Sequence, residues 1–451
     1  MFYNNAAFNQ DISMRDVHLV NDMTYMLRNA GAFNQDLSTW DVRNLQSADN
    51  MLENTALSTY NYNALLDQRS KQNVKSWVNF AASPTQYGGC EVNAAAGIAG
   101  RALLQGKVWN IYDGGLAGCV RPFITTWKTD NTDSYSSNAT SIKIPVYPNI
   151  TGYNFTIDWG DGTTGAYSGA NPVVTHDYGI AGTYTVKIYG DFPRIYFNNS
   201  AARDFLKILS VDQWGDVQWT SMERAFWGCE NLAILANDTP KMSNVTSMQY
   251  MFRGATNLTG NFSGWDTSNV TRTDYMFRDA TNFNQNINSW DVSKVTTMNG
   301  MFRGATNFNQ PLDQWNVGKV WDFNQMFSQA TNFNQPLDMW DMSSATTIGS
   351  MFSQAYNFNQ PLNSWDTSKV TSMGNIFQMA RAFNQPLNNW DTSKVTDMLS
   401  MFLGAFKFDQ DLSSWVVTGV ASMRYMFDST ALSTYNYNAI LNSRSQQNVK
   451  S

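Results

Sequence analysis

MFRGATNFNQPLDQWNVGKVWDFNQ (residues 301–325) is followed by MFSQATNFNQPLDMWDMSSATTIGS (residues 326–350) and MFSQAYNFNQPLNSWDTSKVTSMGN (residues 351–375). We call each such 25-residue segment a coil. The same pattern opens further coils at Met251, Met276, Ile376, Met401 and Met426. A fixed period of this length is typical of repeat architectures, in which no single unit can bury its apolar face alone.

A longer period contains the short one. Residues 51–76 reappear as residues 426–451, identical at 19 of 26 positions, and the correspondence runs back to Met1 at a constant offset of 375 residues. We therefore expect a tandem array of units of about 375 residues, as in a fibre or a surface stalk.

Apolar residues follow two spacings within a coil. In one half they recur every three or four residues, as at Met298, Met301 and Ala305, which is the spacing of a helix face. The other half, around Leu312 and Trp315, has the pattern of an extended segment that stacks on the next coil. The sequence predicts an α+β repeat solenoid, leucine-rich-repeat-like, over residues 221–430. Its buried column would contain Leu312, Leu337, Leu362 and Leu387.

Two rows of polar residues recur in register. One Asn per coil lies at a predicted bend, where its amide can satisfy unpaired backbone groups. This row contains Asn309, Asn334, Asn359 and Asn384. An Asp precedes Ser or Thr before the predicted helical half, which favours a cap on the following turn. This row contains Asp266, Asp291, Asp341, Asp366 and Asp391. Binding of Ca²⁺ along the Asp row is the alternative.

One Trp per coil forms a further row. Its members include Trp290, Trp315, Trp340, Trp365 and Trp390. An exposed aromatic row can bind sugars, whereas a buried row supplies the large apolar area that a thin stack needs. We expect burial. Variable positions, such as Arg253, Gln329, Met379 and Leu403, are expected to line any binding face.

Residues 121–199 interrupt the repeat. Segments that alternate polar and apolar residues, such as YNFTIDWGDG and GTYTVKIYGDF, are separated by Gly or Asn turns, which predicts a small all-β sandwich. The phrase DWGDG at residues 158–162, followed by THDY at 175–178 and GTYTV at 182–186, resembles the PKD-type, Ig-like domain.

The phrase FNQPL…WDxSxVTxM…MF, repeated across residues 1–50 and 243–427, resembles the BspA-type leucine-rich-repeat (26-residue-repeat) surface proteins with PKD-like domains, as in giant surface adhesins of Bacteroidota. The link DFPRIYFNN…ILSVDQWGDVQWTSMERAFWGCENL is similar to that family's junction between PKD-like domain and repeats. The resemblance implies secretion, display at the cell surface and adhesion, and it supplies no catalytic residues.

Four segments are expected on these grounds. They are the C-terminal coils of a preceding array (1–76), a block that closes that array (77–120), the PKD-like sandwich (121–199), and a second array that ends with the start of its cap (200–451). The repeat arrays would thus alternate with sandwiches along the chain.

Charge and cysteine content limit the classes of binding partner and the cellular location expected for the protein. A net charge of −6 and a pI near 5.0 argue against nucleic acid and anionic membrane surfaces. No apolar stretch is long enough for direct membrane insertion. Cys90 and Cys119 end similar Gly-Gly-Cys and Ala-Gly-Cys phrases around a short block, which favours a disulfide and an extracellular location; two buried thiols are the alternative. Cys229 is expected to be free.

Three classes of function compete. The first is a structural and adhesive extracellular filament or stalk, whose partners are glycans, proteins or further copies of the unit. The second is a glycan-binding module, which needs exposed aromatic residues beside polar ones. An enzyme is the weakest hypothesis: Asp158, Asp161, His176 and Asp177 could form a site, but a turn and a strand end explain them more simply. Asp158 and Asp161 are also weak metal candidates. We expect no catalytic residues and no cofactor.

Overall fold

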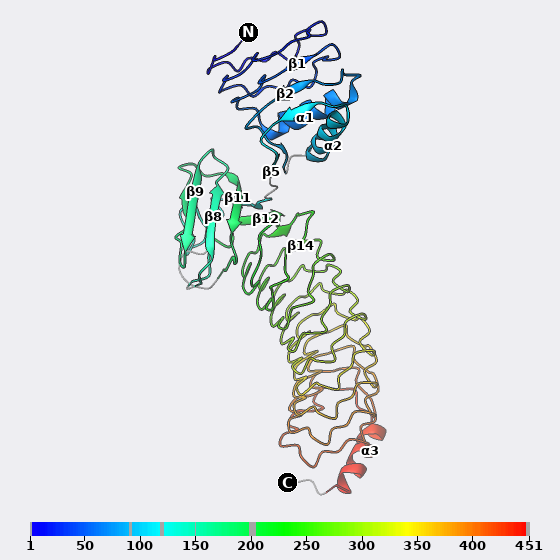
Figure 1. The fold of residues 1–451 in the computed structure, drawn as a ribbon. Helices are drawn as coiled ribbons and strands as arrows, with labels where there is room; N and C mark the ends of the chain where they lie inside the picture. The colour runs from blue at the N-terminus through cyan, green and yellow to red at the C-terminus, as the bar shows by residue number, and fades with distance from the viewer. Residues whose placement is uncertain (1, 90–92, 118–120, 149, 198–203, 448–451) are drawn as a thin grey trace. The chain divides into compact units, whose positions relative to one another are not determined.

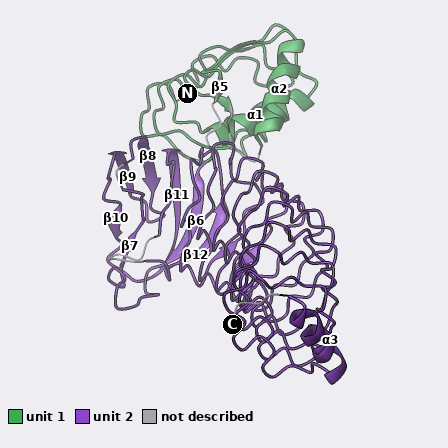
Figure 2. Cartoon of the chain, turned by 90° about the horizontal axis from the view of Figure 1, so that it is seen from below, with its two compact units in different colours: residues 1–121 green, residues 122–451 purple. Residues whose placement is uncertain are grey.

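The structure is a computed structural model that divides into two compact units, Met1–Arg121 (unit 1) and Pro122–Ser451 (unit 2), shown in Figure 2. The first two segments expected from the sequence fall in unit 1, and the last two fall in unit 2 apart from Arg121. The structure describes residues 2–89, 93–117, 121–148, 150–197 and 204–447.

Unit 1 contains coils followed by two packed helices, α1 (Thr59–Lys71) and α2 (Ala94–Gly106). The side chain of Ser58 caps α1 by accepting a hydrogen bond from the backbone N–H of Asn61. Gly100 lies so close to α1 that an added Cβ would meet the backbone oxygen of Leu66 at 2.7 Å. Glycine at this position therefore allows the two helices to cross closely.

Short parallel strands connect the coils of unit 1 to its helices. They are β1 (Ser47–Ala48), β2 (Asn79–Ala81) and β4 (Asn110–Tyr112), in the order β1-β2-β4, and a separate pair, β3 (Tyr87–Gly88) and β5 (Leu116–Ala117). The unit has its own buried core, which includes Tyr62, Leu65, Leu66, Phe80 and Trp109.

Unit 2 begins with a seven-stranded mixed sheet in the order β14-β13-β12-β6-β11-β8-β9. The strands are β6 (Phe123–Lys128), β8 (Tyr153–Asp158), β9 (Thr164–Gly169), β11 (Thr183–Asp191), β12 (Ile208–Gln213), β13 (Ala233–Ile234) and β14 (Thr259–Gly260). A separate antiparallel pair is formed by β7 (Ser141–Lys143) and β10 (Thr175–Asp177).

The large sheet continues directly into the coils. Strand β12 pairs antiparallel with β6 on one side and parallel with β13 on the other, and β13 pairs parallel with β14. We call the part of unit 2 from β6 to β12 the β-rich region. Because β13 and β14 belong to the first coils of the repeat, the β-rich region and the coils share one sheet. Figure 1 shows β11, β12 and β14 along this transition.

Beyond β14 the coils stack on one another, and each coil consists mainly of turns. Single parallel bridges link neighbouring coils, as between Thr297 and Asp322. Some backbone N–H groups bond to the next coil and others bond within their own coil. The N–H of Phe302 donates to the oxygen of Met326 in the next coil at 2.9 Å, whereas the N–H of Ala305 donates to the oxygen of Phe302 in its own coil at 3.0 Å. Each coil therefore satisfies part of its backbone with the coil that follows.

The predicted α+β repeat solenoid alternating with a sandwich is wrong. None of the seven coils over residues 251–425 contains a helix; the described helices are α1, α2 and α3 (Thr434–Ser445), and α3 lies in the last coil, which opens at Met426. The largest sheet is the mixed seven-stranded one, and the sheets do not form a solenoid. Residues with positive φ, for example Gly300 (56°) and Gly304 (71°), interrupt any right-handed helix, so the apolar spacing of three and four arises from overlapping turns.

Residues at one register of successive coils form buried columns. The Leu column is at most 1% exposed, as expected, at Leu312, Leu337, Leu362 and Leu387. Phe302 and Phe327 stack with their ring centroids 5.6 Å apart and their planes within 4°. The core of unit 2 is therefore continuous from coil to coil.

Candidate functional site

The structure brings together two of the four residues considered for catalysis. The Nε2 atom of His176, on β10, lies 2.7 Å from Oδ2 of Asp161, in the turn after β8. The hydroxyl and the backbone N–H of Thr163 both donate to Oδ1 of Asp161. Partial burial would raise the pKa of Asp161, but the hydrogen bonds from Thr163 and His176 outweigh it and lower the pKa to about 2.

The other two carboxylates have different partners. Asp158 forms an ion pair with Lys187 at 3.1 Å, and Asp177 accepts a hydrogen bond from the hydroxyl of Thr140 at 2.7 Å. The four side chains therefore do not converge on one point.

The contacts of His176 differ from those of a catalytic triad. The hydroxyl of Thr163 lies 3.5 Å from Nε2 of His176, the same nitrogen that contacts Asp161. In a triad the carboxylate and the nucleophile occupy different ring nitrogens, so this histidine cannot relay a proton between them. The His176 ring also stacks on Trp159 at 4.7 Å. These contacts brace a turn.

No three His, Cys, Asp or Glu side chains within the described residues are arranged to hold a metal ion. The weak metal candidates Asp158 and Asp161 face Lys187 and His176 instead. Cys90 and Cys119, for which a disulfide was predicted, lie outside the described residues. Cys229 is a free, buried thiol, and burial raises its pKa.

The Asn row links neighbouring coils. Oδ1 of Asn334 accepts hydrogen bonds from the backbone N–H of Asn359 at 2.9 Å and from Nε2 of Gln360 at 3.1 Å. The same bond to the backbone recurs in the pairs Asn309–Asn334 and Asn359–Asn384. The row therefore satisfies backbone groups at the bend of each coil.

The Asp row closes turns and caps no helix. Oδ1 of Asp291 accepts the backbone N–H of Ser293 at 2.9 Å, and Asp391 accepts that of Ser393 at the same distance. Hydrogen bonds from these serines lower the pKa of each aspartate. The cap predicted on the following turn is thus confirmed at Asp291 and Asp391, although no helix follows it.

The Trp row is buried. Trp365 and Trp390 are 2% and 3% exposed, and their rings stack at 6.1 Å with planes 3° apart. The Nε1 group of Trp390 donates to the backbone oxygen of Leu362 at 2.9 Å. A sugar ring cannot reach these faces, so the row serves the core.

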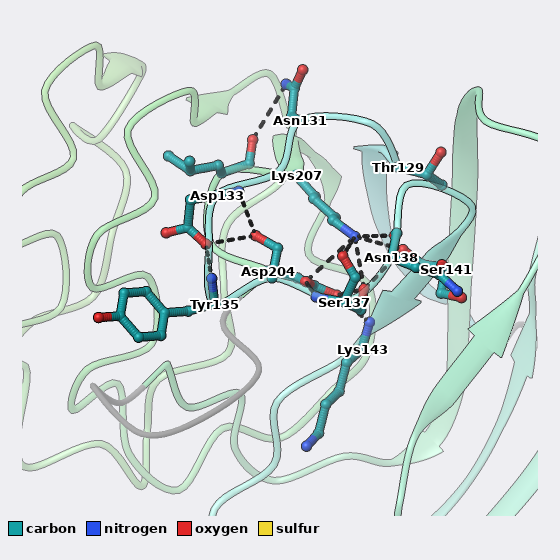
Figure 3. A network of polar contacts seen from close by, with 12 residues as sticks. Thr129, Asn131, Asp133, Tyr135, Ser137, Asn138, Ser141, Lys143, Asp204 and Lys207 are labelled. Atoms are coloured by element: carbon teal, nitrogen blue, oxygen red, sulfur yellow. Dashed lines mark hydrogen bonds and ion pairs between the residues drawn. The ribbon is translucent and has the colours of Figure 1, made fainter.

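A buried ion pair holds the β-rich region together, as Figure 3 shows. The side chains of Lys207 and Asp204 are both fully buried and lie 3.5 Å apart. Nζ of Lys207 donates to the backbone oxygens of Ser137, Asn138 and Ser141 at 2.8–3.0 Å. Burial lowers the pKa of Lys207. Because three backbone carbonyls accept hydrogen bonds from its Nζ, this lysine has a structural role, which was not predicted from the sequence.

An aromatic and polar groove opens on the coils that follow the sheet, with a volume of about 520 Å³. We call it the coil groove. Its principal lining residues are Tyr250, Tyr275, Trp321, Asp274, Asn299 and Asp322. None of the variable positions expected to line a binding face, namely Arg253, Gln329, Met379 and Leu403, is among its lining residues. The guanidinium of Arg253 lies 5.8 Å from the ring centroid of Tyr250, which does line the groove. Sequence reasoning missed this groove.

The sequence did contain a signal for the coil groove. Trp321 occupies a coil position where six other coils have Thr: Thr246, Thr271, Thr296, Thr346, Thr371 and Thr396. The other residues at this position are small or polar, since the coil at Met401 has Ala421 there and unit 1 has Asn21 and Gln46. Trp321 is 48% exposed, so it has no role in the buried columns.

Comparison with known proteins concerns the coils. The family described as "Mycoplasma protein of unknown function, DUF285" matches residues 1–87, 220–340 and 321–440, which is more than half of the chain. The chain belongs to this family. The segments that match the DUF285 family contain the coils of both units, and they exclude most of the β-rich region between them. Searches of curated proteins and of solved structures found no match. None of the described helices is long and apolar enough to cross a membrane.

Proposed function

We propose that the chain is a non-enzymatic, extracellular structural and adhesive module of a surface filament or stalk built from tandem units of about 375 residues. The observation that carries this proposal is the backbone bonding between coils, exemplified by Phe302 to Met326 and Gly304 to Ser328. Each coil is held by the next, and a sequence with this period can extend by adding coils.

The 375-residue offset also supports the proposal, because equivalent segments have the same local structure. Ser58 and Ser433 cap α1 and α3 with the same backbone angles to within 1°. Gln72 Oε1 accepts the backbone N–H of Val42 at 2.8 Å, and its counterpart Gln447 accepts that of Val417 at 2.9 Å. A tandem chain would use this junction once in every unit.

The resemblance to the BspA-type, 26-residue-repeat surface proteins favours surface display and adhesion. The contacts of Asp161 and His176 favour a brace over an active site. A glycan-binding module is the second candidate. The buried Trp row cannot bind sugars, but the coil groove contains the exposed Trp321 beside half-buried polar residues such as Asn299 and Asp322.

Electron microscopy of material sheared from the surface of the source cells tests the proposal. We expect thin fibres that an antibody against unit 2 decorates at regular intervals. Recovery of the protein only as a compact soluble monomer would overturn the filament.

A further inference from the structure

We propose that the coil groove binds a neutral carbohydrate, with Trp321 packing on a sugar ring beside the edges of Tyr250 and Tyr275. This inference deepens the adhesive part of the proposed function, and it names the ligand class and the site.

Trp321 is the exposed aromatic residue of the coil groove, and the half-buried Tyr250 and Tyr275 are ordered by their neighbours. Tyr250 and Tyr275 stack with ring centroids 5.1 Å apart, and the ring of Tyr275 rests against Gly300. An added Cβ on Gly300 would meet Cδ1 of Tyr275 at 2.6 Å, so the glycine makes room for this ring. Trp321 comes from the coil that follows the coil of Gly300, and it is 48% exposed. Carbohydrates present patches of C–H groups that pack on such rings.

Polar groups lie beside these rings in a fixed arrangement. Oδ2 of Asp274 accepts hydrogen bonds from Nε2 of Gln249 at 2.8 Å and from Nε of Arg272 at 3.2 Å. Oδ2 of Asp322 accepts one from Nδ2 of Asn299 at 3.0 Å. Asp274 is buried, and its Oδ1 also accepts the hydroxyl of Thr297, so this carboxylate is fully engaged. Asp322 is half-buried, and its carboxylate has further lone pairs that can accept sugar hydroxyls.

Several polar atoms of the coil groove have no hydrogen-bond partner in the described part of the protein. Oδ1 of Asn299 is buried and accepts no hydrogen bond. The hydroxyls of Tyr250 and Tyr275 and the Nε1 group of Trp321 likewise have no protein partner. A ligand rich in hydroxyl groups would supply partners to the two tyrosine hydroxyls and to Nε1 of Trp321, whereas Oδ1 of Asn299 is out of its reach.

The charge of the coil groove selects among sugars. It contains the carboxylates of Asp274 and Asp322, while its guanidinium, that of Arg272, is already paired with Asp274. Three further guanidiniums, those of Arg224, Arg253 and Arg278, lie over the two tyrosine rings, and the first and last pair with Glu223 and Asp279. Charges of the two signs are therefore nearly balanced around the coil groove, so a carboxylated or sulfated sugar meets no excess of positive charge. A neutral oligosaccharide fits this balance.

Native gel electrophoresis in gels that contain a soluble polysaccharide tests the proposal with the full chain. The probes are a glucan, a mannan and a galactan, with hyaluronate as the anionic comparison. We expect at least one neutral probe to retard the protein and hyaluronate to leave its mobility unchanged.

Trp321→Thr is the decisive variant, because it restores the residue found in six other coils. Their threonines donate to the preceding coil, as Thr371 does to the backbone oxygen of Thr346 at 3.2 Å, so the introduced residue suits the fold. We expect unchanged thermal stability and about tenfold or greater loss of affinity. Phe406→Thr, which removes an exposed aromatic residue outside the coil groove, should bind like the unaltered protein.

Three results would overturn the carbohydrate site: no retardation by any neutral probe, retardation by hyaluronate alone, or undiminished binding by Trp321→Thr. None of them bears on whether fibres exist at the cell surface. Failure of the coil groove and failure of the filament are therefore distinguishable.

Discussion

Oδ1 of Asn334 accepts the backbone N–H of Asn359 at 2.9 Å, and this one bond crosses from one coil to the next. The donor lies at a bend, where the strand pairing of a continuous sheet is absent. A side-chain amide therefore substitutes for a missing backbone partner. Since the bond recurs with the 25-residue period, it helps to join each coil to the next along the stack.

Replacing Asn334 by Ala should destabilise unit 2 by about 1–3 kcal/mol, because the N–H of Asn359 loses its acceptor in a half-buried position. Urea denaturation measures this difference. The matched control is Asn332→Ala in the same coil, since Asn332 is exposed and its side-chain contacts are 3.4 Å long. Equal effects of the two substitutions would show that the row does not support the bend.

Truncation of Leu362 to Ala should cost about 2–5 kcal/mol, because the cavity opens between coils that are fixed by their own backbone bonds. Leu362 is fully buried, whereas Met339 in the preceding coil is 80% exposed. Met339→Ala should change stability by less than about 0.5 kcal/mol. Thermal unfolding compares the two variants; a negligible loss for Leu362→Ala would argue against a tightly packed Leu column.

Replacing Arg69 by Met should stabilise unit 1 by about 1–4 kcal/mol, since the change removes an unpaired buried charge. Arg69 is 1% exposed, and none of its three guanidinium nitrogens has a hydrogen-bond partner in the described part of the chain. Burial lowers its pKa to about 10. The cost of the charge is therefore present at neutral pH and is relieved as the pH rises above 10.

Thermal unfolding of Arg69→Met should be compared with that of Arg43→Met. Arg43 is a suitable control because it is exposed and paired with Asp41 at 2.6 Å. A lower melting temperature for Arg69→Met would reveal that the guanidinium has an anionic partner in solution.

Asp161→Asn should weaken the β-rich region at neutral pH and have little effect near pH 2. The pKa of Asp161 falls from 3.8 to about 2 on folding, so the contribution of its carboxylate is fully present above pH 3.8. That contribution is lost as the pH falls through the folded value. Denaturant midpoints of the two proteins between pH 7 and pH 2 should converge; a constant difference would mean that ionisation of Asp161 is irrelevant.

The repeat and its buried columns could be predicted because the 25-residue period places identical residues in register, as at Leu337 and Leu362. The helical halves could not, because overlapping turns and a helix produce the same apolar spacing. Gly300 and Gly304 with positive φ decide between them, and residues such as Asn375 (58°) adopt the same conformation elsewhere. Residues that rarely adopt the left-handed region, such as Tyr275 (55°) and Gln325 (59°), also occupy this coil position, so residue type does not mark it in the sequence.

The shared sheet had no visible sequence signal. Strands β13 and β14 have two residues each, which is too short for an alternating pattern. Lys207 was missed for a similar reason: its acceptors are backbone carbonyls of a distant loop, which no residue type marks. The coil groove was in principle detectable, because Trp321 stands where six other coils have Thr.

The most direct test of the central claim, that this chain works at the cell surface, is antibody labelling of the source cells before and after permeabilisation. An antibody against unit 2 should label intact cells as strongly as permeabilised ones, and brief protease treatment of intact cells should remove the signal. Labelling that appears only after permeabilisation would contradict a surface filament.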